Sequence, residues 1–284
     1  MGFKFANFLY EFTLAEGYLA RCSPPGKFSG AAGTFASLGG ADGEAVQAHI
    51  MASLGVAAAP ISTQVVSRLH LAEFLFALAS LAAALERLGK EFRNLQRSEI
   101  GETSEGFDAA GGQVGSSTMP QKRNPHKSER ICGLARVVRA QLSAALETVS
   151  LEHERDLTNS AAERVTLPTA TCLTHYCLRE MAKILAALAV DEPAVARNLA
   201  AGGGRQLAER IMMALADKHG RQAAHEILRT HAGAADFLAA LRGDARITGA
   251  FSPAELDALL DTRTYIGSAP AAVDRIVAAY GVTK

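Results

Sequence analysis

The chain has 284 residues, 49% of them hydrophobic, which is enough to bury a substantial core in one large domain or two smaller ones. Lys plus Arg and Asp plus Glu balance at 29 each, so no global field would attract nucleic acid or an anionic membrane. No uninterrupted apolar run reaches the roughly 20 residues that span a bilayer, and the N-terminus lacks a signal-peptide pattern. We therefore expect a cytoplasmic protein that binds neither nucleic acid nor membrane.

Apolar residues recur at helical spacing along almost the whole chain. Helices are expected over 3–20, from Asp42 to about Leu54, and over 61–100, with a Pro- and Gly-rich interruption at 23–40. The third helix would be roughly 60 Å long at 1.5 Å per residue. Its apolar stripe is Leu71, Leu75, Leu78, Leu81, Leu85, Leu88 and Phe92.

Two more long helices are expected over 124–150 and over roughly 160–189. The first would begin with an Asn124 cap and Pro125 at the first helical position. Beyond 190 the apolar periods shorten and glycines mark the ends of small helices. The fold class is therefore all-α: a long-helix bundle over 1–190, truncated at its N-terminus and carrying a loop at 106–125, and a small helical C-terminal domain over 191–284.

The loop at 106–125 is rich in glycine and then in polar residues, GSSTMPQKRNP at 115–125. Its glycines suit a lid that closes over a ligand, although a flexible linker between two helices has the same composition. Lys122, Asn124 and Arg130 would gather donors at the positive end of the following helix, where carboxylates and phosphates bind. Neither nucleotide-binding fingerprint fits, because Gly26-Lys27 is followed by Phe28 instead of Ser or Thr, and no strand precedes the GGQVG run.

GSSTMPQKRNP fills every fixed position of G-S-S-x-M-P-x-K-x-N-P and so resembles the signature of the fumarase/aspartase superfamily. Within that superfamily, four further segments resemble adenylosuccinate lyases: GKFSGAAGTFA at 26–36, STQVVSR at 62–68, LQRSEIGE at 95–102 and HERDLTNSAAERVTLP at 153–168. The C-terminal YIGSAPAAVDRIV is also similar. The resemblance therefore extends over essentially the whole chain.

The resemblance implies an anti β-elimination that splits a succinyl-amine into fumarate and an amine. Carried over by position, Ser116 is the base that removes a proton beside a carboxylate. Lys122 would stabilise the serine alkoxide, and with Asn124 would hold the substrate carboxylate as charge develops. Glu129 would orient a catalytic histidine, and Arg130 would bind substrate. The family needs no cofactor, and no metal site is expected from the spacing of the cysteines and histidines.

RDLTNSAAER, at 155–164, is a candidate phosphate site. In one continuous helix Arg155 and Arg164 would face opposite sides. If Thr158 or Asn159 instead caps a new helix, Arg155 lies in the preceding loop while Ser160 and Arg164 share a helical face, so that all three can meet one phosphate. A surface network of Arg, Glu and Asp is the structural alternative, and the resemblance favours the phosphate.

In the neighbouring STQVVSR segment, Gln64 resembles a substrate-contacting glutamine of the family. Arg68 is as readily explained by an ion pair. The family's general-acid histidine lies upstream of the point where this chain begins, and Thr174-His175 does not take over that role. We expect a fragment or split protein whose substrate is a succinyl-purine nucleotide or its precursor ribotide, and whose partner is itself, as a homotetramer. A muconate cycloisomerase-like enzyme and a catalytically silent oligomerising module remain alternatives.

Overall fold

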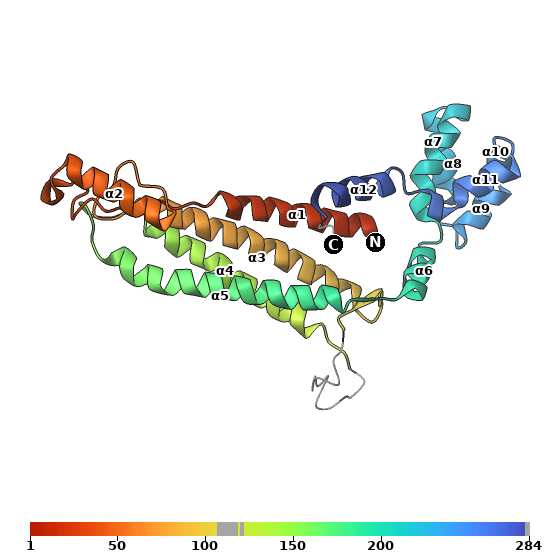
Figure 1. Ribbon diagram of the computed structural model, residues 1–284. Helices are drawn as coiled ribbons and strands as arrows, with labels where there is room; N and C mark the ends of the chain where they lie inside the picture. The colour runs from red at the N-terminus through yellow and green to blue at the C-terminus, as the bar shows by residue number, and fades with distance from the viewer. Residues whose placement is uncertain (107–118, 120–121, 282–284) are drawn as a thin grey trace. The chain divides into compact units, whose positions relative to one another are not determined.

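The computed structural model describes residues 1–106, 119 and 122–281, and these residues are predominantly helical (Figure 1). The all-α prediction is confirmed. A small addition is the two-stranded sheet formed by β1 (Thr103–Ser104) and β2 (Ala189–Val190), which the sequence did not indicate. The chain divides into two compact units, Asn7–Arg97 with Thr103–Ala189, and Met1–Ala6 with Ser98–Glu102 and Val190–Lys284.

The first unit is built on long helices that lie side by side in Figure 1, with α4 packed against both α3 and α5. Its helices are α1 (Gly2–Arg21, from residue 7 on), η1 (Ala36–Leu38), α2 (Ala41–Leu54), α3 (Leu69–Leu95), α4 (His126–Glu147) and α5 (Thr158–Ala186). Leu75 and Leu78 of α3 meet Ala135 and Val138 of α4 in one buried cluster. Small alanines opposite leucines allow the helices to approach closely, so the apolar stripe predicted for α3 forms the bundle core.

The helix predicted over 61–100 is shorter than expected, because α3 begins only at Leu69 and is about 40 Å long. The preceding residues are held outside the helix by Lys27. Its Nζ donates to the carbonyl oxygens of Gly30 at 2.6 Å, Thr63 at 3.1 Å and Gln64 at 2.9 Å. Pro60 also disfavours a helix around it. These local contacts override the apolar periodicity.

By length and composition alone, α3 is apolar enough to cross a membrane, although polar residues interrupt its apolar run. Half of its apolar window is buried inside the protein. A core helix of a soluble bundle passes the same test, so this helix is weak evidence for a membrane span.

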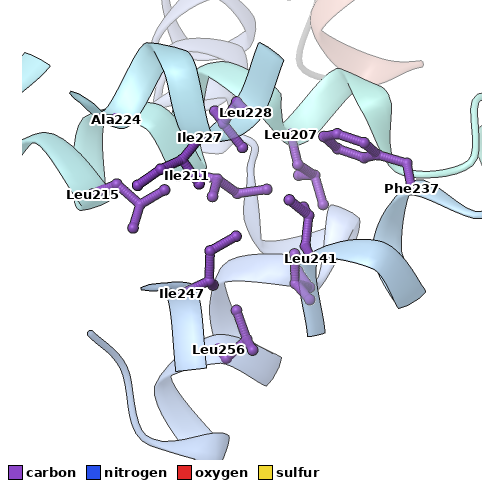
Figure 2. Packing of buried hydrophobic residues seen from close by; sticks show 11 residues of the cluster. Leu207, Ile211, Leu215, Ala224, Ile227, Leu228, Phe237, Leu241, Ile247 and Leu256 are labelled. Atoms are coloured by element: carbon purple, nitrogen blue, oxygen red, sulfur yellow. The ribbon is translucent and has the colours of Figure 1, made fainter. Parts of the chain in front are cut away.

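The second unit contains short helices around a core of its own (Figure 2). Its helical elements are α6 (Glu192–Ala201), η2 (Arg205–Leu207), α7 (Ala208–His219), α8 (Arg221–His231), α9 (Phe237–Gly243), α10 (Ala245–Thr248), α11 (Pro253–Leu260), η3 (Thr262–Thr264) and α12 (Ala269–Tyr280). Leu207, Ile211, Phe237, Leu241 and Ile247 are buried almost completely. Side-chain caps set many of the boundaries, as where Asp191, Asp236, Asp244 and Ser252 each accept a backbone N–H of the helix that follows.

Candidate active site

An open pocket of about 530 Å³ lies beside the first turns of α5. This volume lies within the range of small-molecule sites. The pocket is lined by Val65, Arg68, Arg155, Asn159, Ser160, Glu163, Arg164, Leu167 and Pro168. It therefore contains all three residues of the predicted phosphate site.

The three residues converge because α5 begins at Thr158 instead of continuing from an earlier helix. Arg155 lies in the loop before α5, as predicted, while Ser160 and Arg164 are four residues apart on the helix. The predicted cap is wrong in its detail. Leu157 occupies the cap position, and the Oδ1 of Asp156 accepts from the backbone N of Thr158 at 2.7 Å, which fixes the start of the helix.

Two polar atoms at this pocket are buried and unpaired. Neither the Nε of Arg155 nor the Oδ1 of Asn159 has a hydrogen-bond partner among the residues that the structure describes. One is a donor on a cation and the other is a neutral acceptor. Buried polar groups are ordinarily hydrogen-bonded, so an unpaired pair at a pocket is what a binding site without its ligand would present.

An ion pair shapes one wall of the pocket. The Nε of Arg68 donates to Oε1 of Glu163 at 2.8 Å, and the Nδ2 of Asn159 donates to the same oxygen at 3.2 Å. The ion-pair reading of Arg68 is thus correct. Neither Glu163 nor Asn159 was predicted as a site residue, although their i, i+4 spacing on one helix indicates that their side chains meet.

Gln64 lies close to this pocket in the chain, next to the pocket residue Val65. Its backbone N donates to the carbonyl oxygen of Glu154 at 3.3 Å, which joins the 62–68 segment to the loop before Arg155. The side chain of Gln64 is exposed. Lys27 fixes its carbonyl oxygen, and burial lowers the pKa of that lysine.

Of the residues predicted to carry the chemistry, those that the structure describes lie outside this pocket. Ser116 lies outside the described residues. Lys122, Asn124, Glu129 and Arg130 are all exposed around the start of α4. The Nη1 of Arg130 donates to the hydroxyl of Tyr176 at 2.6 Å.

The first turn of α4 departs from the prediction. Asn124 does not cap the helix, and Pro125 takes the cap position. The buried carboxylate of Glu105 accepts from the backbone N of Ser128 at 2.8 Å and of Lys127 at 3.3 Å. A carboxylate of the protein itself therefore occupies the helix end that was expected to attract a substrate anion. This corrects the role expected of the helix amides, but it leaves Lys122 and Asn124 exposed.

Lys122 and Asn124 lie beside the start of α4, whereas the residues of the phosphate pocket follow its end. This helix runs from its start beside Lys122 and Asn124 through 22 residues to Glu147, and a short loop then leads to Arg155 and α5. At 1.5 Å per residue, α4 separates the phosphate pocket from Lys122 and Asn124 by about 33 Å. Figure 1 shows that α4 and α5 start at opposite ends of the bundle. Within one chain, therefore, the phosphate pocket does not form a single site with Lys122 and Asn124.

Family models match both parts of the chain. A model described as "Lyase" matches residues 20–140, and one described as "Adenylosuccinate lyase C-terminus" matches residues 198–276. The chain belongs to the fumarase/aspartase superfamily. Within this superfamily it is similar to adenylosuccinate lyases. Among the described residues of this superfamily member, no group of three or more His, Cys, Asp or Glu side chains is placed to hold a metal ion.

Curated relatives of this superfamily member are adenylosuccinate lyases. The enzyme of Archaeoglobus fulgidus is 42% identical over 89% of this chain and 57% of its own length. Those of Methanothermobacter thermautotrophicus and Synechocystis sp. are 41% and 38% identical, over 97% and 93% of this chain. The chain spans 63% and 62% of these two enzymes, which is less than two thirds of their length.

Solved structures of the same superfamily share the fold. The 3-carboxy-cis,cis-muconate lactonizing enzyme of Pseudomonas putida matches 98% of this chain and 62% of its own, with a TM-score of 0.85 and 31% identity. A fumarate lyase from Mesorhizobium sp. BNC1 matches 97% of this chain and 63% of its own, with a TM-score of 0.85 and 28% identity.

Proposed function

We propose that the protein acts in an adenylosuccinate lyase-type anti β-elimination, releasing fumarate from adenylosuccinate and from its imidazole-carboxamide analogue SAICAR in purine nucleotide synthesis. The observation that carries the proposal is the pocket at the start of α5, where Arg155, Ser160 and Arg164 meet. The similarity to adenylosuccinate lyases over most of the chain supports the same reaction.

In this proposal the pocket holds the nucleotide phosphate. The buried Nε of Arg155 lacks an acceptor among the described residues, and a phosphate oxygen is an acceptor that carries the opposite charge. Ser160 supplies a neutral hydroxyl donor, and the guanidinium of Arg164 a second charged fork. Gln64 would contact substrate from the adjoining 62–68 segment.

The chemistry belongs to the other end of the bundle. We assign Ser116 as the base that removes the proton from the carbon beside a substrate carboxylate. The electrons pass into that carboxylate, and the C–N bond then breaks as fumarate forms and the leaving nitrogen gains a proton. Lys122 and Asn124 would stabilise the developing negative charge, with Glu129 and Arg130 in supporting roles. No histidine of this chain is assigned as the general acid.

We further propose that the protein works as a cytoplasmic homotetramer. The separation of about 33 Å between the two residue groups supports this, since one substrate could bridge them only if different copies contributed them. We also propose a domain boundary near residue 190. Residues 1–190 would form the bundle that assembles, and residues 191–284 would form a C-terminal helical domain.

A cycloisomerase acting on a carboxylated muconate is the second candidate. The likeness to the Pseudomonas putida lactonizing enzyme favours it. A muconate has no phosphate, however, and would leave Arg155, Ser160 and Arg164 without a shared ligand. A catalytically silent oligomerising module is the third candidate, and it would bind no nucleotide at this pocket.

Nucleotide binding and fumarate release together test the proposal. AMP titrated into the purified protein should bind, and an Arg164→Gln variant should bind it about 10- to 100-fold more weakly, because a charge-assisted hydrogen bond to phosphate is lost. The matched control is Arg179→Gln, which removes the same charge from an exposed position on the same helix. This control should change AMP affinity by less than about twofold.

Turnover is followed as fumarate absorbance after adenylosuccinate is added, and a Ser116→Ala variant should abolish any turnover that the wild-type protein shows. If AMP fails to bind the folded wild-type protein, the phosphate pocket is wrong. If both arginine variants weaken AMP equally, binding is general electrostatics and the assignment of Arg164 fails. Turnover of 3-carboxy-cis,cis-muconate in place of adenylosuccinate would establish the second candidate.

A further inference from the structure

Asn159 presents a buried hydrogen-bond acceptor at the phosphate pocket. The residue is 2% exposed, lines the pocket and lies on the first turn of α5. Within the described part of the chain its Oδ1 has no hydrogen-bond partner. Leaving a buried carbonyl oxygen unpaired costs free energy, so the position is explained if a bound molecule supplies the donor.

The orientation of this amide is set by its neighbour. The Nδ2 of Asn159 donates to Oε1 of Glu163, and an ionised carboxylate can only accept. Arg68 donates to the same oxygen, which holds the carboxylate in place. The amide oxygen therefore cannot exchange places with the nitrogen without setting two acceptors against each other. Asn159 is fixed as an acceptor toward the rest of the pocket.

The dianion of a phosphate monoester cannot satisfy both unpaired atoms through its phosphate group alone. Its oxygens accept hydrogen bonds and so match the Nε of Arg155, but they have no hydrogen to give to Asn159. A ligand that pairs with both atoms needs an anionic group and a hydrogen-bond donor, such as a hydroxyl, on one framework. The pocket volume of about 530 Å³ leaves room for more than a phosphate, since one water occupies about 30 Å³ of liquid.

We propose that Asn159 is a specificity-determining residue, whose Oδ1 accepts a hydrogen bond from a sugar hydroxyl of the phosphorylated ligand. The inference rests on the proposed function, because Arg155, Ser160 and Arg164 must hold the phosphate for the sugar to lie nearby. It adds to that function a reason why a ribose phosphate is preferred over other phosphate esters of the same charge.

The test compares two probes of equal charge, ribose 5-phosphate and methyl phosphate, by isothermal titration calorimetry. Wild-type protein should bind ribose 5-phosphate about tenfold more tightly than methyl phosphate, as one added hydrogen bond implies. Asn159→Leu, which keeps the branching at Cγ and the number of heavy atoms, should lose that preference while its affinity for methyl phosphate stays within about twofold. Thr174→Val is the matched control, because Thr174 is also a buried residue of α5 with an unpaired hydroxyl among the described residues, but it does not line the pocket.

Thr174→Val should keep the wild-type preference for ribose 5-phosphate. Equal binding of the two probes by wild-type protein overturns the inference without any variant, and so it stands as a test even if Asn159→Leu fails to fold. A retained preference in Asn159→Leu overturns it too, while the phosphate pocket survives. Loss of methyl phosphate binding in Asn159→Leu would assign Oδ1 to the phosphate group and also overturn it. Failure of both probes to bind wild-type protein would reject the phosphate pocket and this inference together.

Discussion

The guanidinium of Arg68 and the carboxylate of Glu163 meet at 2.8 Å across 95 residues of sequence. This contact joins the residue before α3 to the second turn of α5, and it forms a wall of the candidate phosphate pocket. Only 12% and 16% of the two side chains are exposed, so the pair is screened less than a surface ion pair. The carboxylate of Glu163 also orients the amide of Asn159, so it both forms the wall with Arg68 and fixes a polar group of the pocket.

Replacing Glu163 by glutamine should destabilise the protein by roughly 1–3 kcal/mol. The variant keeps a carbonyl acceptor but leaves the largely buried cation of Arg68 without its counter-charge. Urea unfolding followed by circular dichroism would measure the change. Glu226→Gln is the control, since Glu226 pairs with Arg229 at the surface, where both side chains are more than half exposed. It should change stability by less than about 0.5 kcal/mol, and equal losses in the two variants would contradict the expectation.

Replacing Glu105 by alanine should lower stability by roughly 1–2 kcal/mol and fray the start of α4. Its carboxylate accepts two backbone amides of the first turn, as a cap does, and it complements the helix dipole. Glu105→Gln retains one acceptor oxygen and should lose less. Amide hydrogen exchange at Lys127 and Ser128 reports the fraying directly. Unchanged protection of these amides in Glu105→Ala would show that the cap is not needed.

The bundle could be predicted because its signal is periodic. The stripe from Leu75 to Phe92 is buried as the 3.6-residue spacing indicates, since the helices have only one apolar face to pack. Helix ends were less predictable. Asn124 and Pro125 form the usual start signal, yet α4 is capped by Glu105 from an earlier segment. A long-range contact of that kind leaves no local pattern in the sequence.

In the candidate site, too, the features set by local spacing could be predicted and those set by long-range contacts could not. Arg155, Ser160 and Arg164 could be grouped from local spacing once a break before α5 was assumed, and the structure has that break. The ion pair of Arg68 with Glu163 depends on how α3 and α5 lie in space, and sequence spacing cannot give that. The distance between the pocket and Lys122 follows from the length of α4, which the periodicity did predict.

The buried thiols of the bundle provide a test of its packing. Burial raises the pKa of the Cys177 thiol to about 11 and also raises that of Cys132. At pH 8 only about one in a thousand Cys177 thiols would be ionised, and the thiolate is the reactive form. A coloured disulfide reagent should therefore label these two cysteines only as the protein unfolds. Cys172, which is exposed, serves as the reference for fast labelling. A Cys172→Ser variant should lose the fast labelling of that residue and leave the slow labelling of Cys132 and Cys177 unchanged. Labelling of Cys177 at the rate seen in denaturant would contradict the packing.

Asp244 should make the C-terminal helices sensitive to acid. The Arg246 side chain donates to its carboxylate, and burial, which alone would raise the pKa, is outweighed by this contact and by the Nε2 of His231 at 2.7 Å. The pKa of Asp244 is therefore held well below the ordinary value of about 3.9. Because the unfolded chain binds this proton more readily, the stabilisation is complete above about pH 4 and is lost as pH falls through the folded-state pKa.

Asp244→Asn isolates that charge, because asparagine caps a helix about as well as aspartate and Asp244 caps α10. At pH 7 the variant should be less stable by roughly 1.5–3 kcal/mol, the usual contribution of hydrogen bonds to a charged group. At pH 3 the difference should shrink, since protonation of the unfolded wild-type chain already removes part of its advantage. Thermal unfolding at the two pH values measures both. Asp257→Asn, at an exposed partner of Arg242, should have little effect at either pH. A difference between wild type and Asp244→Asn that is equal at pH 7 and pH 3 would show that Asp244 stabilises through shape and not through charge.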